Sequence, residues 1–130
     1  MNHILKKYCP RIEFDSYEDF YENFKIDVPE AFNFGFDVVD EWARVEPEKR
    51  ALVWCDDADE ERTFTFADLS RLSNQAANAF RALGIGKGDV VMMILRRRWE
   101  YWVCAVALCK LGATIIPASL QLTKKDIVYR

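Results

Sequence analysis

The chain has 130 residues, of which 51% are apolar and 30% charged, and its formal net charge at pH 7 is −3. This composition excludes a disordered chain and fits one domain at most. The acidic balance argues against nucleic-acid binding, since the only basic run is Arg96, Arg97 and Arg98.

The start of the chain and its apolar segments bear on location. The first 14 residues lack the continuous apolar core of a secretory signal. The longest uncharged apolar stretch, residues 101–109, is about half the roughly 18 residues that a membrane-spanning helix needs. The sequence therefore predicts a soluble, cytoplasmic protein with no membrane span.

The four cysteines and the single histidine form no pattern typical of a metal site or a disulfide framework. Cys9, Cys55, Cys104 and Cys109 include no C-x-x-C pair, and His3 lies near the start of the chain. Reduced structural thiols are the favoured interpretation, and no metal ligand is predicted.

Residues 1–32 are predicted to form a helical extension. Aromatic residues recur at helical spacing over residues 17–24, where Asp15 or Ser16 can cap the helix and Pro29 lies beyond its end. Such an aromatic stripe is more typical of a packing face than of a ligand site.

A helix and a hairpin are predicted next. The helix covers residues 34–45, with Asn33 as its cap. Residues 51–55 are apolar and β-prone, residues 62–65 alternate, and the polar turn between them favours an antiparallel hairpin.

A longer helix is predicted to begin after Thr65. The sequence TFAD, residues 65–68, matches a capping box, and an apolar stripe continues to Leu83. The polar residues of this segment are expected to face away from the core: Arg71, Asn74, Gln75, Asn78 and Arg81. Gly84 stands where a glycine ends a helix in the left-handed conformation.

The stretch ALGIGKGDVV, residues 82–91, raises the question of a phosphate-binding loop. Phosphate loops run from strand through glycines to helix, so that the helix N-terminal amides face the anion. Here a helix precedes the glycines, and the purely apolar residues 90–95 follow as a strand expected to be buried on both faces. We therefore predict a helix stop and a turn at this stretch.

A second helix and strand complete a predicted βαβ unit. The helix covers residues 99–111 with Gly112 at its end, and residues 114–117 form the strand. Two strands joined in this way are expected to be parallel. The predicted fold class is α/β, with an N-terminal hairpin and a βαβ portion of a parallel sheet.

Two segments are candidates for ligand binding, because ligands gather beyond the carboxyl ends of parallel strands. Residues 96–99 contain the arginine run, which is either a solvated helix entry or an anion site that offsets unfavourable charge at a helix N-terminus. Gln121 is either a polar loop residue before a helix capped by Thr123 and Asp126 or a binding residue. No catalytic constellation is visible.

Four segments, in this order and spacing, resemble the opening of the acyl-adenylate-forming ligases, which include the AMP-dependent acyl-CoA synthetases. They are TFTFADL at 63–69, SN at 73–74 followed by two alanines, LGIGKGDVV at 83–91 and LGATIIPA at 111–118. Three more, PEAFNF at 29–34, DVVD at 37–40 and LTKKDIVYR at 122–130, look most like the medium-chain acyl-CoA synthetases.

This resemblance implies fold and function. Residues 33–130 would be the first, incomplete part of the large N-terminal AMP-binding domain of an adenylate-forming ligase. The parent enzyme, meaning the full-length synthetase, would use ATP and Mg²⁺ to activate a carboxylic acid as an acyl-adenylate and would then transfer the acyl group to coenzyme A. Its implied role is in fatty acid metabolism. The resemblance also implies that Gln121 contacts coenzyme A.

The family's catalytic, ribose-binding and magnesium-binding motifs come later in such chains, so no catalytic or metal residue is assigned. The 130 residues are expected to be a fragment, because Arg130 lies within a capped helix. Without the later motifs, the fragment is expected to be inactive and to bind no cofactor tightly. Uncovered apolar surface would let the fragment self-associate. The alternative is a stand-alone, non-catalytic interaction module with a ligase-like subfold.

Overall fold

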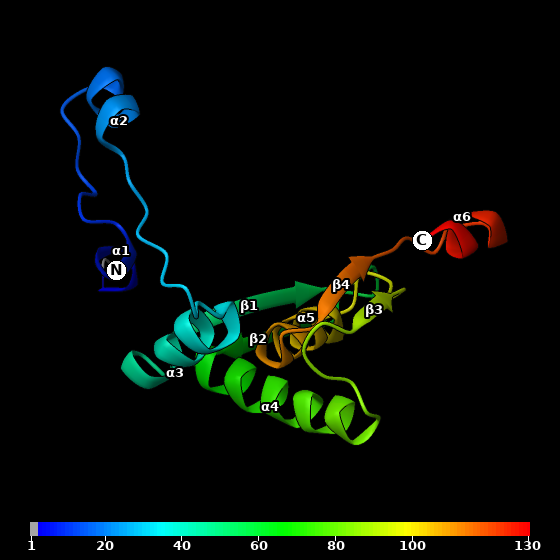
Figure 1. Ribbon diagram of the computed structural model, residues 1–130. Helices are drawn as coiled ribbons and strands as arrows, with labels where there is room; N and C mark the ends of the chain where they lie inside the picture. The colour runs from blue at the N-terminus through cyan, green and yellow to red at the C-terminus, as the bar shows by residue number, and fades with distance from the viewer. Residues whose placement is uncertain (1–2) are drawn as a thin grey trace. The chain divides into compact units, whose positions relative to one another are not determined.

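A computed structural model describes residues 3–130 of the chain (Figure 1). The chain divides into two compact units, Met1–Phe32 and Asn33–Arg130. Each unit has its own packing, and the predicted ligand-binding segments all lie in the second.

The first unit consists of two short helices, α1 (His3–Tyr8) and α2 (Tyr17–Asn23). Ser16 caps α2 as predicted, because its side chain accepts a hydrogen bond from the Asp19 amide at 3.2 Å. Phe20 and Phe24 stack at a centroid distance of 4.9 Å. Part of the aromatic stripe thus packs, whereas Tyr21 is 77% exposed.

The second unit begins with a π-helix, η1 (Gly35–Asp40), that continues as α3 (Glu41–Val45). The sequence predicted a single α-helix over residues 34–45. A helical segment does lie there, but its first part is a π-helix instead of an α-helix. Asn33 caps this segment, since its Oδ1 accepts from the Gly35 amide at 2.9 Å. Its Nδ2 donates to the Cys109 carbonyl at 2.7 Å, which ties the start of η1 to a distant helix.

The hairpin forms as predicted from β1 (Arg50–Cys55) and β2 (Glu61–Thr65). The strands are antiparallel, with Trp54 opposite Arg62. Asp56 closes the turn, because its Oδ1 accepts from the amides of Ala58 and Glu60 at 2.9 and 3.0 Å.

Helix α4 (Phe66–Ala82) follows β2 directly. Its capping box is complete: the Thr65 side chain accepts from the Asp68 amide, and the Asp68 side chain accepts from the Thr65 amide, both at 3.2 Å. Gly84 has a φ of 87°, the left-handed conformation predicted for the helix end.

A βαβ unit closes the second unit, made of β3 (Val90–Met93), α5 (Glu100–Leu111) and β4 (Thr114–Pro117). The two strands pair in parallel, with Met93 opposite Pro117. The predicted α/β class, the hairpin and the parallel pair are confirmed.

The expected strand over residues 90–95, buried on both faces, is wrong in two respects. The strand ends at Met93, and Val90 is 61% exposed. Burial on both faces requires layers on each side of a wider parallel sheet, whereas β3 has β4 as its only paired strand in the described chain.

The core of the second unit lies where α4, α5 and η1 meet. Its buried cluster is Val39, Leu69, Val103 and Val106. The chain ends in α6 (Lys124–Tyr129), which has a second complete capping box between Thr123 and Asp126. Within residues 3–130, no helix combines the length and the apolar character needed to cross a membrane.

Candidate functional site

The carboxyl ends of β3 and β4 lie side by side and release two segments at one edge of the parallel pair. The Ala118 amide donates to the Met93 carbonyl at 3.0 Å, which extends the pairing to the last residue of β3. The segments that follow, residues 94–99 and 118–123, therefore leave the sheet at the same edge. This is the edge at which ligands bind in open parallel sheets.

Gln121 lies in a tight turn within the second of these segments. Its amide donates to the Ser119 hydroxyl at 3.1 Å, and the Leu122 amide donates to the Ser119 carbonyl at 3.3 Å. The Gln121 side chain is exposed and makes no hydrogen bond to another described residue. A short, ordered turn thus presents a free carboxamide, which both donates and accepts hydrogen bonds.

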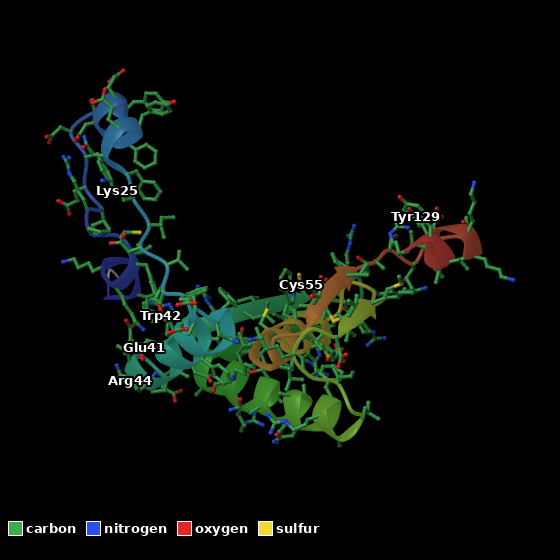
Figure 2. All side chains as sticks on the ribbon, viewed as in Figure 1. Lys25, Glu41, Trp42, Arg44, Cys55 and Tyr129 are labelled. Atoms are coloured by element: carbon green, nitrogen blue, oxygen red, sulfur yellow. The ribbon has the colours of Figure 1, made fainter. Side chains whose placement is uncertain are left out.

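The arginine run lines a cleft with a volume of about 390 Å³. One wall is the end of β1, marked by Cys55 in Figure 2. The other walls are the chain after β3 and the first turn of α5, including Tyr101 and Trp102. Gln121 does not line this cleft, so the structure places the two candidates at the same edge but in different surroundings.

Trp54 and Trp102, from segments far apart in sequence, meet the arginine run in this cleft. Sequence reasoning missed both, because it assigned Trp54 only to a strand and Trp102 only to a helix. The Trp54 indole Nε1 donates to the Arg97 carbonyl at 2.7 Å. This bond, which joins β1 to the segment after β3, has no signal in the local sequence.

The glycine stretch lies at the opposite edge and its amides are already used. The Gly84 amide donates to Arg81, the Gly86 amide to the Asp89 carboxylate and the Gly88 amide to the Gly112 carbonyl, at distances of 2.8 to 3.0 Å. A phosphate loop requires amides that point at the anion. The predicted helix stop and turn are confirmed, and the three glycine amides are already hydrogen-bonded within the protein.

The titratable groups of the described chain offer little nucleophilic or metal chemistry. Burial raises the pKa of the Cys104 and Cys109 thiols, and the Glu100 carboxylate adds to the rise at Cys104. All four cysteines are free thiols, and of these only Cys9 is buried. Among residues 3–130, no group of three or more His, Cys, Asp or Glu residues is placed to hold a metal ion.

The sequence of residues 39–130 matches the family model described as AMP-binding enzyme. The chain is 40% identical over 123 residues to the mitochondrial acyl-coenzyme A synthetase ACSM3 of Mus musculus, covering 90% of this chain and 21% of the relative. It is 39% identical over 109 residues to the mitochondrial ACSM5 of Homo sapiens, covering 79% and 19%. The chain thus spans about a fifth of the length of these relatives.

Solved structures share the fold. A Mycobacterium tuberculosis fatty acyl CoA synthetase matches with a TM-score of 0.66 and 29% identity over 75% of this chain and 18% of that one. Acetoacetyl-CoA synthetase from Streptomyces lividans matches with a TM-score of 0.69 and 24% identity, over 76% and 15%. The βαβ unit and hairpin are therefore a portion of the fold of these synthetases.

The prediction of a cytoplasmic protein is wrong, because the ACSM3 and ACSM5 relatives are mitochondrial. The prediction depended on the lack of a secretory signal and of a membrane-spanning stretch. Neither feature bears on mitochondrial import, which uses amphipathic, arginine-rich transit peptides.

Proposed function

Because this chain belongs to the AMP-binding enzyme family, we propose that it forms part of an ATP-dependent acyl-CoA ligase. The reaction proposed has two steps, with fatty acids as the substrate class. The carboxylate attacks the α-phosphate of ATP to form an acyl-adenylate and release pyrophosphate, and the coenzyme A thiol then takes the acyl group and releases AMP. The similarity to ACSM3 and ACSM5, which are named acyl-coenzyme A synthetases, supports this assignment. ATP would supply the adenylyl group, and Mg²⁺ would offset the charge of its phosphates. Both would be bound by parts of such an enzyme outside these 130 residues.

The proposed role of this segment is to build one ligand-binding edge of the large domain and not to catalyse the reaction. No residue of the segment is assigned a catalytic role, and the 130 residues alone are proposed to be inactive. The carboxyl edge of β3 and β4 is the observation that carries the proposal, because it presents Gln121 from an ordered turn beyond a parallel strand.

Gln121 is proposed to hydrogen-bond coenzyme A. The fit depends on chemistry that the structure displays: the carboxamide is exposed, has no protein partner among the described residues and can both donate to and accept from a polar ligand. Its turn is fixed at one side by Ser119 and at the other by the capped α6, so little ordering is needed on binding.

The test is Gln121→Ala in a full-length synthetase that contains this chain. Loss of one hydrogen bond, worth about 1 kcal/mol, should raise the KM for coenzyme A about five-fold. Adenylate formation, measured as ATP–pyrophosphate exchange driven by the carboxylic acid, should stay unchanged. Gln75→Ala, on the exposed face of α4, is the matched control. An unchanged KM for coenzyme A would contradict the role of Gln121, whereas no exchange activity in the parent would contradict the ligase itself.

A further inference from the structure

The arginine-lined cleft carries three guanidinium groups, and the acidic residue nearest to them in sequence is Glu100, in the first turn of α5. Among residues 3–130, no carboxylate forms an ion pair with Arg96, Arg97 or Arg98, and all three residues are exposed. They directly precede the N-terminus of α5, where the helix dipole is also positive. An anion in the cleft would relieve both the mutual repulsion of the guanidinium groups and their conflict with the dipole.

The backbone that carries the arginines is fixed before any ligand arrives. The Trp54 indole holds the Arg97 carbonyl at 2.7 Å, and the Arg98 amide donates to the Arg96 carbonyl at 2.6 Å. These two bonds give the run a defined bend against the end of β1. A preformed bend lowers the entropy lost on binding, which distinguishes this cleft from a basic segment on a mobile tail.

The remaining walls of the cleft are apolar and aromatic. Val53 and Leu95 lie on them with Tyr101 and Trp102, whose rings meet edge to face at 5.3 Å. Trp102 is 54% exposed, so a bound molecule can cover its ring. Guanidinium groups bind phosphate through paired hydrogen bonds, and aromatic rings pack on flat or apolar bodies.

From this arrangement we propose that the cleft binds a phosphate group carried on an apolar or aromatic body. The volume of about 390 Å³ lies in the range of small-ligand sites. This site is separate from Gln121 and goes beyond the ligase function proposed above. The phosphate belongs either to a soluble ester or to a lipid headgroup, and the two sources are separated by experiment.

The first experiment titrates the 130-residue chain with inorganic phosphate at constant ionic strength and follows the indole N–H signals by NMR. The signals of Trp54 and Trp102 should shift, whereas Trp42, which does not line the cleft, should stay in place. The triple variant Arg96→Gln, Arg97→Gln, Arg98→Gln should bind phosphate at least about tenfold more weakly. Its control, Lys25→Gln, Arg81→Gln, Lys124→Gln, changes the net charge equally at exposed sites outside the cleft.

The second experiment sediments the chain with phosphatidylcholine vesicles, with and without phosphatidic acid. If the chain pellets only with vesicles that contain phosphatidic acid, and the triple variant does not, the phosphate belongs to a lipid headgroup. If the NMR signals shift but the chain does not pellet, the phosphate belongs to a soluble ester. Arg97→Gln alone serves if the triple variant does not fold, because its carbonyl still accepts from Trp54. The proposal is overturned if neither phosphate nor vesicles bind, or if the arginine variants bind like the control.

Discussion

Lys110 places a positive charge inside the second unit. Its side chain is 2% exposed, and its Nζ donates to Asp40 Oδ1 and to Asn74 Oδ1, both at 2.7 Å. Ser70 donates to the same Asp40 oxygen at 2.7 Å. The Lys110 stem also passes Gly35, where a Cβ would overlap its Cγ. These contacts connect η1, α4 and α5 through polar atoms at the edge of an apolar core.

The Lys110 network should be needed for stability as a unit. Lys110→Met leaves the partly buried Asp40 carboxylate without its cation and should lower the free energy of unfolding by about 2 to 4 kcal/mol. Adding Asp40→Asn removes the unpaired charge and should recover part of that loss. Urea unfolding followed by circular dichroism measures both. A direct interaction would be contradicted if the double variant lost as much free energy of unfolding as the sum of the losses in Lys110→Met and Asp40→Asn.

This network could not be predicted from the sequence. The apolar spacing placed Asn74 on the outward face of its helix, and that residue is indeed exposed, yet its carboxamide accepts from a lysine 36 positions away. Lys110 lies in the last turn of the apolar helix α5, and its sequence context gives no sign that its amine turns inward. Periodicity describes which face of one helix is apolar, but the partner of a buried charge depends on how three elements pack.

Helix α4 shows the opposite case, in which local residues define an element. The capping box and the glycine after the helix are signals within four residues of each end, and both were predicted correctly. The hairpin and the βαβ order were predictable for the same reason. The π-winding of η1 was not predicted, and the Asn33 bond to Cys109, 76 positions away, was equally invisible to local sequence patterns.

The capping box of α4 also makes stability depend on pH. The Thr65 amide and then the Arg71 guanidinium hold the pKa of Asp68 below its ordinary value of 3.8. The Asp68 carboxyl therefore binds a proton more tightly in the unfolded chain than in the folded one. Its stabilising contribution is complete above its ordinary pKa and is lost as the pH falls through its lowered pKa in the folded state. In Asp68→Asn, the urea midpoint should change less between pH 6 and pH 3 than in the unmutated chain.

Asp57→Asn, in the exposed hairpin turn, is the control for that measurement. It should keep the pH dependence of the unmutated chain, because Asp68 and its hydrogen bonds to Thr65 are unchanged. If Asp68→Asn and the control show the same difference between the two pH values, the capping carboxylate does not govern the acid response of α4.

The assembled second unit has properties that no single element shows. Its four strands form two separate two-stranded sheets. The arginine-lined cleft arises only where the end of one sheet meets the loop leaving the other. Sequence reasoning found the arginine run and the edge on which it lies, but a cleft between two sheets requires their relative placement. The same arrangement leaves each strand with one edge that pairs with no other described strand.

We propose that these open edges make the chain self-associate. Val90, at the start of β3, is 61% exposed, and Leu83 just before the glycine turn is 77% exposed. Unpaired strand edges beside apolar side chains favour pairing with a second copy.

Sedimentation velocity should therefore show a weight-average mass that rises with concentration. Val90→Lys, which places a charge on the edge strand, should shift the distribution toward monomer, whereas Gln75→Lys on the polar face of α4 should leave it unchanged. A single monomeric species at every concentration would contradict self-association, and equal effects of the two lysines would move the contact away from β3.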